Sequence, residues 1–358
     1  MSRDYLTNII IKICGEKMNN KAINKQIRKI SNSNSLLLLI FLAVTAVGSY
    51  LLKTLIVKSK YGSIWQNPKF TYALTYIAVY LILIPLLLLI FSKTAGKREN
   101  LTYKSIFRKS ERSFGWCFKW VAITIGVSQL LGIISNLIIG VFVQDSQSSG
   151  IDSLITSEND ILGMVMYFIP TALMAPFFEE LFFRASLFRN TEAMGQWFAV
   201  IVTGLSFGLW HTNNSQFVMA TFCGMFLCII YIKTNSIWVC MVTHLINNLL
   251  SFLIVLSKIF IGDILNSQDS EFVIHAMFTK HTAISIIYCL AILITLIFIV
   301  AGPILLIVQL IRKRKNLSLD KGRFQIGTLR KTAVYFSAPL TIAAFILMIL
   351  LTVVTRIS

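Results

Sequence analysis

The chain has 358 residues, of which 56% are hydrophobic and 13% are charged, and its mean hydropathy is +0.74. This composition excludes a soluble globular domain with an ordinary charged surface and predicts an all-α, polytopic transmembrane helical bundle. The net charge of +18 falls largely in short loops between apolar segments. Membrane topology and anionic lipid headgroups account for such loops, so the lipid bilayer is the expected partner and nucleic acid is not.

The N-terminal part of the chain is predicted to hold a polar stretch and three membrane helices. Residues 1–34 are polar and basic, and they are expected to form either a cytoplasmic tail or an interfacial helix. The apolar run 35–57 exceeds the roughly 7 to 15 residues of a signal-peptide core, and no convincing cleavage site follows it. It is therefore expected to be retained. Spans at 72–91 and 116–143 complete the N-terminal transmembrane region.

The loops between these spans predict the orientation of the chain. Residues 93–112 are strongly basic, whereas residues 144–160 carry acidic side chains and neither Lys nor Arg. Basic loops are retained in the cytoplasm, so we expect the first stretch inside and the second outside. The expectation is a multi-pass protein of the cell membrane with a cytoplasmic N-terminus, whose N-terminal transmembrane helices occupy residues 35–158.

A central region, residues 159–261, is expected to contain four helices. The first starts at residue 161 and the last covers 237–261. Between them, the apolar segments 197–211 and 217–232 are shorter than the roughly 20 residues that cross a bilayer. Short segments of this kind suit a protein interior in which helices line a cavity.

The C-terminal part, residues 262–358, is expected to contain the remaining transmembrane helices. A polar loop leads to a span at 283–310, and a basic stretch then precedes a last span at 334–354. The total is nine spans, or eight if one of the short central segments does not cross.

The residues that point to chemistry begin at the end of the fourth span. Glu179, Glu180 and Arg184 interrupt the aromatic run Pro-Phe-Phe-Glu-Glu-Leu-Phe-Phe-Arg, where an ionised side chain is costly unless it is paired or used. In a helix, Glu180 and Arg184 lie four residues apart in the favourable order for an ion pair. Glu179 is rotated by roughly 100° and is left free for chemistry. Burial among aromatic rings makes such a carboxylate a stronger base when it is ionised.

Two further pairs have the same helical spacing in the apolar segments that follow. Phe207 and His211 are four residues apart, and so are His244 and Asn248. Residues four apart share one helix face. An isolated pair of this kind is often interhelical hydrogen bonding or packing, and Glu179, Glu180 and Arg184 alone could simply close a helix at the membrane boundary. Three such motifs on successive helices favour a functional site over these structural explanations.

The order Glu-Glu-x-x-x-Arg, Phe-x-x-x-His and His-x-x-x-Asn on successive membrane helices resembles the CPBP family of intramembrane glutamic proteases. This family includes the type II CAAX prenyl endopeptidases and the bacterial bacteriocin-processing and self-immunity (Abi) proteins. The resemblance covers about residues 160–260 and implies a protease core there.

The resemblance also implies a division of labour. Glu179 and His211 would orient and deprotonate the attacking water, while His244 and Asn248 would form the oxyanion hole. Glu180, Arg184 and Phe207 would support them. The implied partners are membrane-associated peptides or proteins, lipidated or not. In bacteria the implied roles are peptide maturation, bacteriocin immunity or signalling.

No cofactor or metal is expected. The six cysteines lie mostly in apolar segments and include no Cys-x-x-Cys pair, so they predict neither a disulfide framework nor a zinc site. A zinc-dependent membrane protease that uses Glu179, His211 and His244 as ligands remains an alternative. It ranks lower because the sequence has no His-Glu-x-x-His.

Two non-proteolytic alternatives also remain. A non-catalytic membrane scaffold or immunity protein would use the polar cluster for structure alone. A small-solute transporter could use intramembrane charges near the bilayer midplane, but the sequence shows no inverted repeat.

Overall fold

The computed structural model describes residues 20–57, 67–142, 154–157, 159–312, 318–324 and 326–354, and all regular elements in these ranges are helices. The expected all-α polytopic bundle is therefore confirmed. The helices are α2 (Asn20–Val57), α4 (Pro68–Tyr76), η1 (Ile77–Leu83), α5 (Ile84–Phe91), η2 (Ser92–Gly96), η3 (Lys104–Ile106), α6 (Phe114–Phe142), α7 (Ile161–Phe168), η4 (Ile169–Met174), α8 (Ala175–Phe182), η5 (Phe183–Phe188), α9 (Arg189–Thr191), η6 (Glu192–Met194), α10 (Gln196–Trp210), α11 (Asn214–Thr234), α12 (Ile237–Leu265), α13 (Ser270–Thr279), α14 (Thr282–Arg312), α15 (Thr328–Phe336) and α16 (Pro339–Val354).

Within the described ranges, seven helices are long and apolar enough to cross a membrane, and the count rises to eight if α15 and α16 form one span. The expected short span 197–211 is α10, which has only 15 residues. The other expected short span is α11, which is 21 residues long and passes as a full span.

The segment expected as the last span, 334–354, is divided between α15 and α16. The chain bends by 79° between α15 and α16. The break lies directly before Pro339, which lacks an N–H group and disfavours helical geometry in the preceding residue. The expected last span is therefore present only if this bent pair is counted as one span.

Two polar stretches also contain more helix than a tail or a loop would. Residues 20–34 are the first part of α2, and its buried Ile27 and Ile30 pack in a cluster with Phe324 and Val334. After α12, the expected polar loop contains α13, which is capped by the Asp269 carboxylate. Three parts of the expected loops lie outside the described residues: the tail before residue 20, residues 144–153 of the acidic loop 144–160, and the basic residues 313–315.

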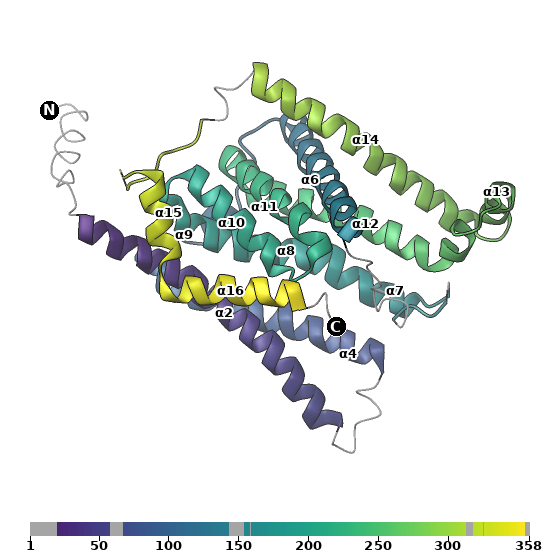
Figure 1. The fold of residues 1–358 in the computed structure, drawn as a ribbon, viewed down its shortest axis with the longest axis horizontal. Helices are drawn as coiled ribbons and strands as arrows, with labels where there is room; N and C mark the ends of the chain where they lie inside the picture. The colour runs from purple at the N-terminus through teal and green to yellow at the C-terminus, as the bar shows by residue number, and fades with distance from the viewer. Residues whose placement is uncertain are drawn as a thin grey trace.

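The helices are arranged around α8, α10, α11 and α12 (Figure 1). In this view α14 lies along one edge of the molecule and α2 along the opposite edge, with α6 between α11 and α14. The N-terminal half of α2 packs against α15, α16 and α9. The central helices are therefore enclosed by helices from both ends of the chain.

Buried polar side chains hold α2 in place. Ser31 donates to the carbonyl oxygen of Tyr335 at 2.8 Å, and Ser35 shares a hydrogen bond with Thr341 at 2.8 Å. The Asn34 amide bonds the Thr191 hydroxyl, also at 2.8 Å. Each of these three α2 side chains is at most 3% exposed. Interhelical hydrogen bonds of this type stabilise helix association where no water can compete.

Candidate active site

The fourth span leaves regular α geometry on both sides of its glutamates. It widens into the π-helical segments η4 and η5, and α8 lies between them. Pro170 in η4 and Pro176 in α8 have no N–H to donate, which disturbs the helical ladder locally. Such π turns occur frequently at functional sites. They set the rotation of the short helix that carries the two carboxylates.

Glu180 is the centre of a buried charged cluster. One of its carboxylate oxygens, Oε1, accepts hydrogen bonds from Arg184 Nη1 at 3.0 Å and from His244 Nδ1 at 2.9 Å. The side chains of Glu180 and Arg184 are completely buried. The ion pair expected from the four-residue spacing is therefore confirmed. The hydrogen bond from His244 joins Glu180 to α12, which the spacing alone does not predict.

Close packing of α10 against α11 completes the environment of Arg184. Its Nη2 donates to the carbonyl oxygen of Gly224 at 3.2 Å. A Cβ atom at Gly224 would lie 3.1 Å from both Gly204 Cα and the Phe207 side chain, so only glycine fits there without displacement. Because Gly224 has no side chain, α11 can approach α10 closely and its Gly224 carbonyl can reach the Arg184 guanidinium.

Phe207 joins the three sequence motifs. The Arg184 guanidinium lies over its ring, 4.6 Å from the centroid. The rings of His211 and His244 meet it nearly at right angles, with centroids 4.9 and 5.7 Å away. Phe207 is buried, with 2% of its surface exposed. It therefore acts as a spacer that sets the two histidines and the arginine relative to one another.

Glu179 points to a different neighbour, as the rotation of roughly 100° between adjacent helical residues requires. Its Oε1 accepts a hydrogen bond of 2.9 Å from the Tyr80 hydroxyl, which comes from η1. Its Oε2 is buried and accepts no hydrogen bond from the part of the chain that the structure describes. The carboxylate is thus oriented through one oxygen, and the other is available to a reacting group.

The sequence interpretation missed Tyr80. It is the last of three tyrosines spaced four residues apart in the second span, Tyr72, Tyr76 and Tyr80, and their rings contact one another in turn at 4.5 and 5.8 Å. A row of phenols on one face of an apolar span is the signal that could have indicated it.

His211 ends α10 and is oriented by its own helix. Its Nδ1 lies 2.8 Å from the Phe207 carbonyl oxygen. Because a carbonyl only accepts, Nδ1 carries the proton in this contact and Nε2 is an acceptor in the neutral ring. Both histidine rings contact Phe207, so His211 and His244 belong to one buried cluster.

Asn248 is fixed by the irregular backbone of the fourth span. In η4 the Ala175 N–H donates to the Pro170 carbonyl, one residue beyond the α pattern. The equivalent donor for the Thr171 carbonyl would be Pro176, which has no N–H. The Asn248 amide supplies the missing donor at 2.9 Å. One of its two N–H bonds is used in this way, and the other is available.

The seven sequence-predicted residues thus come from the fourth span, α10 and α12, which pack together. Glu180, Arg184, Phe207 and His244 are in direct contact. Within the described ranges, no group of three or more His, Cys, Asp or Glu side chains is placed to hold a metal ion. The arrangement offers a held carboxylate, a neighbouring imidazole and two hydrogen-bond donors on one face of α12.

Comparison with protein families agrees with the motifs. Residues 161–250 match the family model described as type II CAAX prenyl endopeptidase Rce1-like. This interval contains all seven residues. No curated protein and no solved structure matches the chain. The family match implies a peptidase embedded in the membrane. It confirms the resemblance drawn from the three motifs: over residues 161–250, the chain is similar to the Rce1-like type II CAAX prenyl endopeptidases.

Proposed function

We propose that this protein is a metal-independent intramembrane glutamic endopeptidase that cleaves a membrane-associated peptide or protein. The observation that carries the proposal is the buried Glu179 carboxylate, one oxygen of which has no hydrogen-bond partner among the described residues, on a helix that packs against α12 with its His244 and Asn248. A carboxylate, an imidazole and two donors are the groups that peptide hydrolysis by an activated water requires.

In this mechanism Glu179 is the general base. A water held between its free oxygen and Nε2 of His211 loses a proton to the carboxylate and attacks the peptide carbonyl carbon. The carbonyl oxygen becomes an oxyanion, which accepts hydrogen bonds from His244 and from the second N–H of Asn248. The proton on Glu179 then passes to the leaving amine as the C–N bond breaks, which regenerates the carboxylate.

The supporting residues set the geometry of these groups. The carboxylate of Glu180 accepts from Nδ1 of His244, so Nε2 of that ring faces away from Glu180. Nε2 can donate to the oxyanion when both ring nitrogens carry a proton. Arg184 holds Glu180, and Phe207 separates the two imidazole rings.

The proposed setting is the cell membrane, with the N-terminus in the cytoplasm, because the basic loops of the chain are expected on that side. The substrate is a peptide or protein presented at the bilayer. In a bacterial cell such an activity would serve peptide maturation, bacteriocin immunity or signalling.

The test is cleavage of membrane-tethered peptides, with and without a lipid chain, by the purified protein in detergent. The variants are Glu179→Gln and, as a matched control, Glu271→Gln, which changes an exposed glutamate of α13. Both proteins are first checked for folding by thermal unfolding. We expect the Glu271→Gln protein to cleave as the wild type does, and the Glu179→Gln protein to be inactive.

A chelator arm separates the mechanisms. Activity of the wild type that survives chelation supports the metal-free mechanism, whereas loss of activity that added zinc restores would establish a zinc enzyme instead. Cleavage by a folded Glu179→Gln protein at the wild-type rate would remove Glu179 from the role of base.

A further inference from the structure

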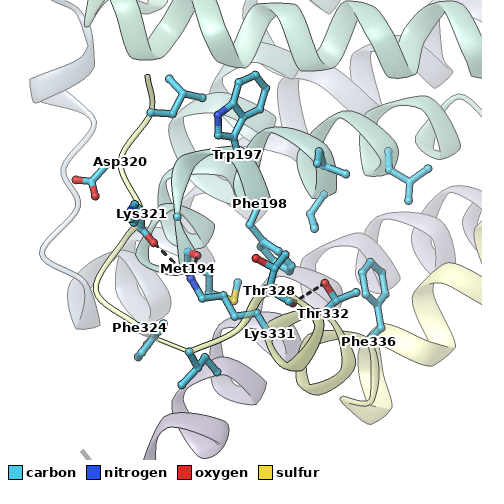
Figure 2. A pocket seen from close by; sticks show the side chains of 16 residues that line it. Met194, Trp197, Phe198, Asp320, Lys321, Phe324, Thr328, Lys331, Thr332 and Phe336 are labelled. Carbon is cyan, nitrogen blue, oxygen red and sulfur yellow. Dashed lines mark hydrogen bonds between the residues drawn. The ribbon is translucent and has the colours of Figure 1, made fainter. Parts of the chain in front are cut away.

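A cavity separate from the proposed catalytic residues lies between the start of α10, the chain segment 318–324 and α15 (Figure 2). Its volume is about 500 Å³, which falls within the roughly 300 to 1,000 Å³ of ligand-binding pockets. None of its lining residues belongs to the three motifs. The apolar part of the lining includes Trp197, Phe198, Ile201, Leu205, Phe324 and Phe336.

One wall of the cavity carries exposed apolar side chains. Trp197 and Ile201 are four residues apart on α10 and therefore share a face, and they are 49% and 53% exposed. Exposed apolar side chains on a membrane helix contact acyl chains. Trp197 is the second residue of α10, and tryptophan is enriched at the level of the lipid headgroups. The mouth of the cavity is thus placed where a phospholipid changes from tail to headgroup.

The opposite end of the cavity holds a buried cation. Lys331 is only 8% exposed, and its Nζ donates to the Met194 carbonyl at 2.7 Å and to the Lys321 carbonyl at 3.4 Å. Among the described residues no carboxylate forms an ion pair with it. Asp320 also lines the cavity, but its Oδ1 accepts from the Gly322 N–H, and Figure 2 shows this carboxylate on the outer side of the segment.

A buried ammonium with carbonyl partners alone is costly, and an anion beside it would lower that cost. The Lys331 ammonium has three N–H bonds, of which two are used. The hydroxyl-bearing Thr328 and Thr332 line the same end of the cavity, as does the exposed Lys321. The polar end therefore suits a phosphate group, while the α10 wall suits a hydrocarbon chain.

We propose that this cavity binds an anionic phospholipid of the bilayer, with its phosphate at Lys331, Lys321 and Thr328 and one acyl chain against Trp197 and Ile201. Charge complementarity favours this occupant over the chain's own N-terminal stretch, which is basic. The site is independent of the proposed peptidase chemistry, so its test does not depend on activity.

The test uses the full-length protein in nanodiscs of phosphatidylcholine that contain a small fraction of brominated phosphatidylglycerol, whose bromine quenches nearby tryptophan. The difference between the wild type and Trp197→Phe isolates the signal from Trp197. We expect saturable quenching by the brominated anionic lipid, and far weaker quenching by brominated phosphatidylcholine at the same fraction. Unbrominated phosphatidylglycerol should reverse the effect.

Matched cation variants locate the headgroup. Lys331→Gln should raise the half-saturating lipid fraction roughly fivefold, as expected for the loss of one cation that contacts an anionic headgroup. Arg330→Gln, which changes the exposed neighbour outside the cavity, should leave it unchanged. Equal quenching by the two lipids, or a Lys331→Gln protein that binds like the wild type, would overturn the proposal.

A second variant decides the matter if the Lys331→Gln protein does not fold. Ile201→Trp fills the apolar wall, and Ile304→Trp places the same side chain on α14, at a position that is 55% exposed. Native mass spectrometry of the purified proteins should show bound phosphatidylglycerol lost from the first variant and kept by the second. Retention by both, or by neither, would contradict a lipid site at this cavity.

Discussion

Replacement of Tyr80 by phenylalanine tests whether the orientation of Glu179 matters. The change removes one oxygen atom, and with it the 2.9 Å hydrogen bond to Oε1. The phenylalanine leaves no unsatisfied donor behind, and its ring keeps the contacts of the tyrosine ring with Tyr76 and Phe178. A hydrogen bond to an ionised group contributes about 1.5 to 3 kcal/mol. If Glu179 uses this bond to hold its position during water activation, the loss corresponds to roughly a 10- to 100-fold lower kcat.

The assay is steady-state cleavage, with kcat and KM determined separately, on protein whose thermal unfolding matches that of the wild type. Tyr76→Phe is the matched control, because it removes a phenol from the same row that does not donate to Glu179 in the structure. We expect kcat to fall for Tyr80→Phe alone, with KM nearly unchanged. Full activity of Tyr80→Phe beside an inactive Glu179→Gln would refute the positioning role. A rise in KM at constant kcat would instead make Tyr80 a substrate contact.

Three further predictions follow from the contacts of the site and of its outer end. Asn248→Ala removes the proposed oxyanion donor and should lower kcat by roughly 100- to 1,000-fold in a protein that still folds; an unchanged kcat would exclude that role. Arg184→Met leaves Glu180 buried without its guanidinium and should lower the free energy of unfolding by about 3 to 5 kcal/mol, and adding Glu180→Gln should recover part of this loss. Denaturant unfolding in detergent measures both, and strictly additive effects would contradict the coupling. At the N-terminal ends of α4 and α7, the Lys69 ammonium, 2.6 Å away, holds the pKa of the Asp160 carboxyl well below its ordinary value of about 3.9. Because the folded-state pKa is depressed, the stabilisation is present above that ordinary value and is lost as the pH falls towards the folded-state pKa. Thermal unfolding should therefore show Asp160→Asn less stable than the wild type above about pH 5, with the difference shrinking below about pH 4. A difference that does not change with pH would contradict the charge-based explanation.

Local geometry explains which parts of the site could be predicted from the sequence. The Glu180–Arg184 ion pair follows from a four-residue spacing within one helix, and any helical run fixes it. The apolar segments likewise predict the helices, because a bilayer requires long hydrophobic runs with internally bonded backbones. These features depend on neighbouring residues only.

The remaining contacts depend on how separate spans rotate against one another. Tyr80 meets Glu179 across 99 positions of sequence, and no pattern within either span specifies that rotation. The partner of Asn248 could not be foreseen either, since it is a backbone carbonyl released by a π-helical register. The break before Pro339 is different in kind. The proline is a signal that the sequence itself carries, and the sequence interpretation did not use it.

The hydrogen bonds between α2 and the end of the chain have a consequence for biogenesis. Ser31 precedes Tyr335 by 304 positions and Ser35 precedes Thr341 by 306, so α2 is synthesised long before its partners. Until then the two hydroxyls can bond only carbonyl oxygens of their own helix. Packing of α2 against α15 and α16 consequently waits until both of those helices have been synthesised. A nascent chain that stops before α16 exposes polar groups that membrane quality control can recognise.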